Sequence, residues 1–244
     1  MYLFLKVENK MAICYLDIET IPCQTPGYFE KCLASIKAPG NYSKPDTINK
    51  WMEENKFIEA DKLHRKTSFD GALGEIISIA WAIDDNPVDV IYRDNLLIDD
   101  EKKLLVDFFD EISKLTDDHG QRTTISTWIG HYLTGFDLRF LWQRCVINGI
   151  KPSVIIPYDA KPWDTRVFDT KLEWTGASSS YSGIGKLGDM SQAFGFEGKG
   201  DIDGSKVYDY WLAGCIEEIA EYNKEDVEMC RRLYKKMNFI DVLK

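Results

Sequence analysis

The stretch Ala12-Ile-Cys-Tyr-Leu-Asp-Ile-Glu-Thr20 holds two carboxylates within a run of β-forming residues. The run is too short for a typical helix and favours a strand. Side chains alternate along a strand, so Asp17 and Glu19 share one face. Cys14, Leu16 and Ile18 share the other face. Carboxylates this close either disfavour each other's charged form or bind a cation, and a divalent metal is a frequent partner of such pairs. An edge strand with two solvent-facing acids is the alternative interpretation.

The segments that follow predict an α/β protein. Glu75–Ile83 and Val88–Arg93 are apolar runs separated by Asp-Asp-Asn-Pro, which favours a β-hairpin or meander. An amphipathic helix then carries apolar residues at helical spacing: Leu104, Leu105, Phe108, Phe109 and Ile112. Thr123–Ile129 is predicted to be another strand. Because strands come first and helices interleave later, we expect a mixed central β-sheet flanked by helices.

A long connection separates the first predicted strand from the second. It contains four prolines, and the apolar residues of its second half, Asp46–Lys66, recur in a helical pattern. A connection of this length is not a bare loop. We therefore expect a helical insertion over about residues 22–70, which serves either as packing scaffold or as a lid or dimer contact.

Composition limits the class of protein. The 244 residues are 44% hydrophobic and 29% charged, which excludes disordered, collagen-like and coiled-coil proteins and suits a single domain over residues 1–244. No apolar run approaches the ~20 residues of a membrane-crossing helix, and we expect a soluble cytoplasmic protein. The six cysteines form no Cys-x-x-Cys pair, which argues against a zinc ribbon or a redox motif.

The formal net charge of −10 bears on possible partners. Taken alone it argues against non-specific binding to a polyanion, because nucleic-acid affinity comes mostly from Lys and Arg that neutralise phosphates. Acids that hold divalent cations reverse this argument, since the bound metals make the site locally positive.

The C-terminal part is expected to be mostly helical from Ser205 to Met237, with a break at Gly214. In its last helix Tyr222 and Asp226 fall on a stripe with apolar residues at three- and four-residue spacing: Ile219, Cys230, Leu233 and Met237. A carboxylate on an inward stripe is costly to desolvate unless it is paired or metal-bound. A contact between Tyr222 and Asp226 at the border of the stripe is the alternative.

Asp137 has a simpler explanation by itself. The chain turns into a helix after Thr123–Ile129, and Asp137 lies in its first turn. Thr134 would be the N-cap with an acid three residues later, as in a capping box, and the helix dipole favours an anion there. Taken alone, Asp137 is therefore interpreted as structural.

Together these segments resemble the DEDD exonuclease superfamily of the ribonuclease H-like fold. Three of them match its motifs in the right order: Asp17-Ile-Glu19-Thr, Phe136-Asp137 with Leu141, and Tyr222-Asn-Lys-Glu-Asp226-Val. A tyrosine four residues before the last aspartate is typical of the DEDDy branch, whereas the DEDDh branch would have His at Glu221. The segments 17–22 and 198–207 are similar to a stand-alone group of predicted 3′–5′ exonucleases that resemble the proofreading domain of family B DNA polymerases.

This resemblance implies the cofactors and the roles of the residues. Asp17, Glu19, Asp137 and Asp226 would hold two Mg²⁺ or Mn²⁺ ions, one lowering the pKa of an attacking water and the other stabilising the departing 3′ oxygen. By analogy Asp17 bridges the ions, Glu19 and Asp226 complete the ion on the side of the nucleophile, and Asp137 supports the second. Tyr222 would orient the water.

Contacts to nucleic acid are less well marked. Where such proteins often have Asn five positions before the second-motif aspartate, this chain has Tyr132. We therefore expect different contacts to the terminal nucleotide. Basic and aromatic residues interleave around the segment Gly176–Gly183, which is predicted to be a mobile loop: Trp163, Arg166, Lys171, Trp174, Tyr181 and Lys186. Ordinary surface charges beside core aromatics are the alternative. His131 is interpreted as a loop residue that forms hydrogen bonds rather than as a catalytic base.

The sequence therefore predicts a metal-dependent 3′–5′ exonuclease that acts on single-stranded or fraying DNA and releases nucleoside 5′-monophosphates. DNA is the expected partner because of the polymerase resemblance, and RNA remains possible. The alternatives are an exoribonuclease that uses the same residues and, with less support, a catalytically silent nucleic-acid-binding module. A ribonuclease H-like transposase or resolvase gives no reason for Tyr222 before Asp226.

Overall fold

The computed structural model describes residues 11–93, 100–116, 123–176, 183–196 and 202–240. Five strands in these residues form one sheet in the order β3-β2-β1-β4-β5. The bounds are β1(Met11–Ile21), β2(Glu75–Ile83), β3(Asp89–Tyr92), β4(Thr124–Gly130) and β5(Val167–Asp169). The four predicted strands are confirmed to within a residue or two. The three-residue β5 was not predicted from the sequence, because its pattern is too short to show a period.

The sheet is mixed, as expected. β1 pairs antiparallel with β2 on one side and parallel with β4 on the other. The β1–β2 register shifts after Glu19, where Glu19 faces Ser78 and Thr20 faces Ile76, so Ile77 has no partner across the ladder. Such a bulge bends the strand and re-aims its side chains. β1 is therefore a central strand with an irregularity at the level of its carboxylates.

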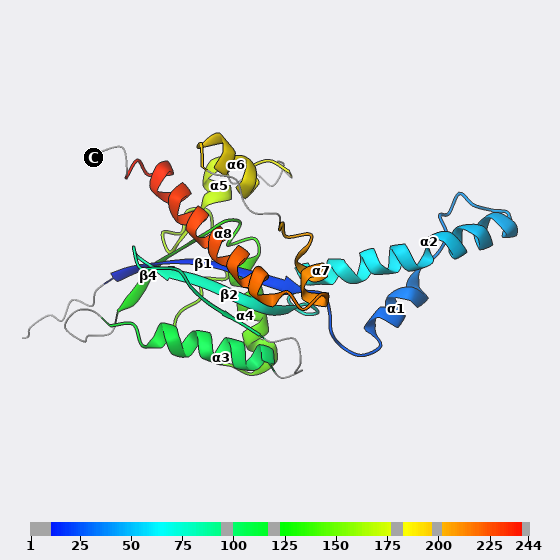
Figure 1. Ribbon diagram of the computed structural model, residues 1–244, viewed down its shortest axis with the longest axis horizontal. Coiled ribbons are helices and arrows are strands. Elements are labelled where there is room, and N and C mark those ends of the chain that lie inside the picture. Colours follow the sequence, from blue (N-terminus) through cyan, green and yellow to red (C-terminus); the bar gives the residue numbers. More distant parts are fainter. Residues whose placement is uncertain (1–10, 94–99, 117–122, 177–182, 197–201, 241–244) are drawn as a thin grey trace, which may run out of the picture.

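Helices cover both faces of the sheet (Figure 1). α3(Asp100–Ser113) and α4(Asp137–Asn148) pack on the face that carries Cys14, Leu16 and Ile18 of β1, around Phe108 and Phe140. The long helix α8(Ile216–Met237) crosses the other face, where Val227 meets Tyr15, Ala80 and Ile129. The architecture is α/β with a mixed sheet flanked by helices, in agreement with the ribonuclease H-like prediction.

The connection between β1 and β2 is helical, as predicted. It contains α1(Tyr28–Ser35), α2(Pro45–Arg65) and a 3₁₀ turn, η1(Lys66–Phe69), and Figure 1 shows α2 projecting from the rest of the molecule. Phe29 of α1 packs edge-on against Phe57 and His64 of α2. His64 also lies 2.8 Å from the backbone oxygen of Cys23, at the base of the insertion. Phe57 is 64% exposed.

Short helices complete the C-terminal part: α5(Thr170–Thr175), α6(Leu187–Ala193) and α7(Val207–Leu212). The predicted break before α8 is confirmed, because Gly214 has a φ of +79°, a conformation that glycine adopts without strain. Most of the predicted loop Gly176–Gly183 and part of the 198–207 segment lie outside the described residues.

Two expectations drawn from composition can be compared with the described helices and the cysteines. None of the described helices is long and apolar enough to cross a membrane. All six cysteines are free thiols, and five of them are buried.

A buried ion pair joins α3 to α4. Glu101 accepts hydrogen bonds from Nε and Nη2 of Arg144 at 2.8 and 2.6 Å, and it also accepts one from the backbone nitrogen of Ile76 at 2.8 Å. Arg144 donates in addition to the backbone oxygen of Gly71. The pair therefore ties two helices to the start of β2 on the face of the sheet opposite α8.

Replacing Arg144 with Met tests this anchor. The change leaves a buried, uncompensated carboxylate, so we expect the free energy of unfolding to fall by about 3–5 kcal/mol. Urea unfolding followed by circular dichroism measures the loss. Lys103→Met on the same α3 is the control, because Lys103 is exposed and pairs with Asp107 at the surface, and its effect should stay within about 0.5 kcal/mol. Equal stability of the two variants would contradict an anchoring role.

Candidate functional site

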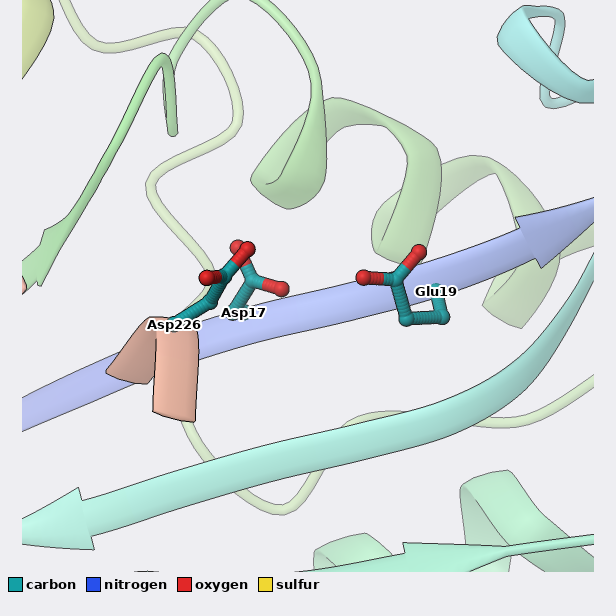
Figure 2. A group of neighbouring side chains, drawn as sticks. All are labelled: Asp17, Glu19 and Asp226. Carbon is teal, nitrogen blue, oxygen red and sulfur yellow. The ribbon is translucent and has the colours of Figure 1, made fainter. Parts of the chain in front are cut away.

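Asp17, Glu19 and Asp226 lie together above the sheet (Figure 2). Asp17 and Glu19 project from the α8 face of β1, and Asp226 projects from α8 toward them. One carboxylate oxygen of each lies within 4.8 Å of the others, with Glu19 and Asp226 buried and Asp17 half-buried. Oxygen donors so closely spaced suit hard divalent cations such as Mg²⁺ or Mn²⁺.

Asp137 approaches the same strand from a different element. It is the first residue of α4, and its Oδ1 accepts a hydrogen bond from the backbone nitrogen of Ile18, between Asp17 and Glu19, at 3.2 Å. The parallel pairing of β1 with β4 ends at Tyr15, so this backbone nitrogen lies beyond the reach of β4. All four carboxylates line one cleft of about 580 Å³.

The pKa of Asp137 is shifted mainly by the burial of its carboxyl group. Burial raises the pKa of Asp137 to about 8, and the nearby charges of Asp169 and Asp226 act in the same direction, against the backbone hydrogen bonds. In the protein without cations the Asp137 carboxyl therefore keeps its proton near neutral pH. A divalent cation reverses this balance by favouring the charged form.

The predicted cap of α4 is wrong. Phe136, not Thr134, is the N-cap residue, and no side chain caps the helix. The hydroxyl of Thr134 donates instead to Oδ2 of Asp169 at 2.9 Å. The physical reason is position, because α4 begins at Asp137 and Thr134 lies two residues before its N-cap, in the loop that Asp169 holds. The carboxylate of Asp137 is thus not used in a capping box and turns to β1.

Tyr222 lies one turn before Asp226 on α8 and is buried. Burial raises the pKa of its phenol well above the ordinary value, and the charges of Glu19, Asp226 and Asp17 add to the effect, together with a side-chain hydrogen bond to Asp226. The phenol therefore keeps its proton and acts as a hydrogen-bonding group rather than as a base.

The sequence did not single out Asn223. This residue is fully buried, and its Nδ2 donates to Oδ2 of Asp17 at 2.8 Å. Its Oδ1 accepts from the hydroxyl of Ser78 on β2 at 3.2 Å. A signal existed, since Asn223 lies three residues before Asp226 and so shares its helix face. The chain from Ser78 through Asn223 fixes the orientation of the Asp17 carboxylate.

The sequence also did not single out Asp169, the last residue of β5. Its Oδ1 accepts from the backbone nitrogens of Tyr132, Lys171 and Leu172, and its Oδ2 accepts from the backbone and hydroxyl of Thr134. This buried carboxylate joins the loop before α4 to the first turn of α5. A three-residue strand gave no pattern from which to expect it.

The candidate nucleic-acid residues fall into two groups. Tyr132 and Lys186 line the cleft with the carboxylates, as does Lys171. Trp163 and Arg166 do not. Trp163 is 81% exposed and borders a separate hollow, and the guanidinium of Arg166 is bonded to Asp164.

The remaining members of that predicted set have other surroundings. Trp174 packs edge-on against Phe194, and Tyr181 lies outside the described residues. The side chain of His131 also lines the cleft, where its Nδ1 lies 3.0 Å from the hydroxyl of Thr170. That contact agrees with the interpretation of His131 as a hydrogen-bonding loop residue.

Comparison with known proteins places this site in context. A family model described as predicted 3′–5′ exonucleases related to the exonuclease domain of PolB matches residues 70–242. The matched residues begin after β1, so they include Asp137, Tyr222 and Asp226 but neither Asp17 nor Glu19. No curated protein sequence matches the chain.

A solved structure supports the same fold. The family B DNA polymerase of the hyperthermophilic archaeon Pyrobaculum calidifontis is similar over 93% of this chain, with a TM-score of 0.54 and 16% sequence identity. The likeness covers 24% of the polymerase chain, so the present chain spans about a quarter of that protein. At this identity the similarity shows the fold. Because the family model matches well over half of the residues, the chain belongs to the family of predicted 3′–5′ exonucleases related to the exonuclease domain of PolB.

Proposed function

We propose that this protein is a metal-dependent 3′–5′ exonuclease of single-stranded or fraying DNA that releases nucleoside 5′-monophosphates, with residues 1–244 acting as one exonuclease domain. The observation that carries the proposal is the meeting of Asp17, Glu19 and Asp226 within 4.8 Å, in a cleft that Asp137 also lines. Because the chain belongs to a family of predicted exonucleases, a role of these acids in phosphodiester hydrolysis is the interpretation that we favour.

The four carboxylates would hold two Mg²⁺ or Mn²⁺ ions. Their donor set fits this use, because carboxylate oxygens are the ligands such cations prefer and the crowded negative charge needs compensation. When bound, the cations would lower the pKa of the attacking water and stabilise the departing 3′ oxygen. The protein's part is to hold Asp17 through Asn223 and Asp137 through the backbone nitrogen of Ile18.

Tyr222 has the role of a positioning group. Its protonated phenol lies beside Asp226 and Glu19, where it orients the attacking water by a hydrogen bond. The ring of His131 forms a hydrogen bond with the hydroxyl of Thr170, and we assign it no part in proton transfer. No Ser, Cys or His nucleophile is required.

DNA is the favoured substrate because the family is related to a polymerase exonuclease domain and the similar solved structure is a DNA polymerase. RNA cleaved by the same residues is the second candidate. Labelled DNA and RNA oligonucleotides of the same sequence separate the two.

The proposal is tested with a 5′-labelled single-stranded DNA oligonucleotide and Mg²⁺ or Mn²⁺ on a denaturing gel. The wild type should produce a ladder that shortens from the 3′ end, and chelation of the metal should stop it. Asp137→Ala and Asp17→Ala should each abolish the ladder while circular dichroism shows a folded protein, because both changes remove a metal ligand, and Asp17→Ala also relieves charge repulsion. Wild-type activity in either variant would contradict the metal assignment, and an inactive wild type would contradict the function.

Tyr222→Phe removes one hydroxyl and keeps the ring in place. We expect kcat to fall roughly 10- to 100-fold with little change in DNA binding, since positioning of the water is lost while the cleft is unchanged. Single-turnover rates and fluorescence anisotropy measure the two quantities separately. An unchanged rate would reduce Tyr222 to a packing residue.

Asn223→Ala removes the donor that orients Asp17. We expect about a 10-fold or larger loss in kcat and a higher Mg²⁺ concentration at half-maximal activity, because groups that orient metal ligands typically affect affinity or activity to this extent. Ser78→Ala is the graded control, since it removes only the outer link of the chain and should have a smaller effect. Metal titrations that coincide for Asn223→Ala and the wild type would rule out this role.

A further inference from the structure

The cleft must bring a polyanionic strand next to four carboxylates, in a protein whose formal net charge is −10. Bound metal ions neutralise the acids themselves, but the rest of the strand also needs positive charge. Of the described residues that line the cleft, Lys171 and Lys186 carry an ammonium group. Lys186 is exposed and Lys171 half-buried.

Lys171 forms no ion pair with any described carboxylate. It lies instead over the ring of Tyr132, with its Nζ 4.1 Å from the ring centroid. A cation in this position is attracted by the negative face of the ring without being neutralised. The ammonium is therefore held in place on the cleft wall with its full charge.

The local backbone conformation determines where the ring of Tyr132 lies. Tyr132 has a φ of +62°, an uncommon conformation for a residue with a side chain. Its ring covers Gly135 so closely that a Cβ at position 135 would lie 2.4 Å from a ring carbon. Glycine at this position is thus a condition for the ring to adopt its place.

Asp169 ties the two partners to each other. Its Oδ1 accepts from the backbone nitrogen of Tyr132 at 2.9 Å and from that of Lys171 at 3.1 Å. Asp169 is 4% exposed, so these bonds are shielded from water. One buried carboxylate therefore sets the relative position of the ring and the lysine, and the same carboxylate holds Thr134 close to the start of α4.

We propose that Lys171, held against Tyr132 by Asp169, binds a phosphodiester group of the substrate strand. The inference rests on the proposed function and adds a phosphate-binding residue to it. A compact ammonium with three donors suits a phosphate. The lysine also covers a face of the Tyr132 ring, so that face holds a cation and does not stack on a base.

The test compares Lys171→Met with Lys103→Met and Lys171→Arg. All three are assayed for kcat and KM on a single-stranded DNA oligonucleotide at several salt concentrations, and for binding of the same labelled strand by fluorescence anisotropy in the absence of metal. Lys103 lies on α3, on the opposite face of the sheet, and is exposed. Its replacement changes the net charge by the same amount.

For Lys171→Met we expect KM and the dissociation constant to rise roughly tenfold, with a smaller change in kcat, because a charged hydrogen bond to the strand is lost. The slope of log affinity against log salt should become shallower by about 0.7, the amount for one phosphate contact on a single strand. Lys171→Arg should restore the slope, and Lys103→Met should leave KM and slope unchanged.

A different set of outcomes would overturn the inference. If the slope of log affinity against log salt is the same for Lys171→Met and Lys103→Met, and the wild type cleaves DNA, Lys171 does not bind a phosphate. The proposed exonuclease function would then still stand. A wild type that binds DNA with the expected slopes but cleaves neither DNA nor RNA would overturn the proposed function and keep the phosphate contact.

Tyr132→Leu should give a KM between wild type and Lys171→Met, since it removes the ring that holds the ammonium.

Discussion

Asp17, Glu19 and Asp226 hold carboxylate oxygens within 4.8 Å of one another, and the repulsion between them has to be offset by the rest of the molecule. Packing alone cannot do this, because burial makes the charged forms less favourable still. Hydrogen-bond donors lie beside two of the acids of the site. The side chain of Asn223 donates to Asp17, and the backbone nitrogen of Ile18 donates to Asp137. Protonation or bound cations can offset the remaining negative charge, and carboxylate oxygens so closely spaced suit divalent metals, as the proposed function requires.

The sheet topology explains why the acids meet where they do. β1 pairs with its antiparallel neighbour β2 from Cys14 to its end at Ile21, but its pairing with the parallel neighbour β4 ends at Tyr15. Beyond that point the edge of β1 is open to α4, and Asp137 enters from there. The register shift after Glu19 changes the course of the ladder at the same level.

Positive charge reaches the same cleft through few residues, of which Lys171 is one. The carboxylate of Asp169 accepts five hydrogen bonds from the loop before α4 and from α5. In doing so it places Lys171 over Tyr132. An acidic protein can thus present a local positive charge to a phosphate backbone, because the position of a lysine matters more than the sum of charges over the surface.

The sequence by itself determined the elements that carry a long, regular pattern and the acids that stand out from it. The alternation around Asp17 and Glu19 and the helical stripe that holds Tyr222 and Asp226 predicted both the elements and the buried faces. The family resemblance already grouped the acids of the site, and only the tertiary structure decided how their side chains meet and which groups position them. The role of Asp137 depends on the open edge of β1, and those of Asn223 and Asp169 depend on partners far away in the chain. The physical reason is that local periodicity reports which face of an element is buried, whereas hydrogen bonds between elements are set by topology and register, which no local pattern encodes.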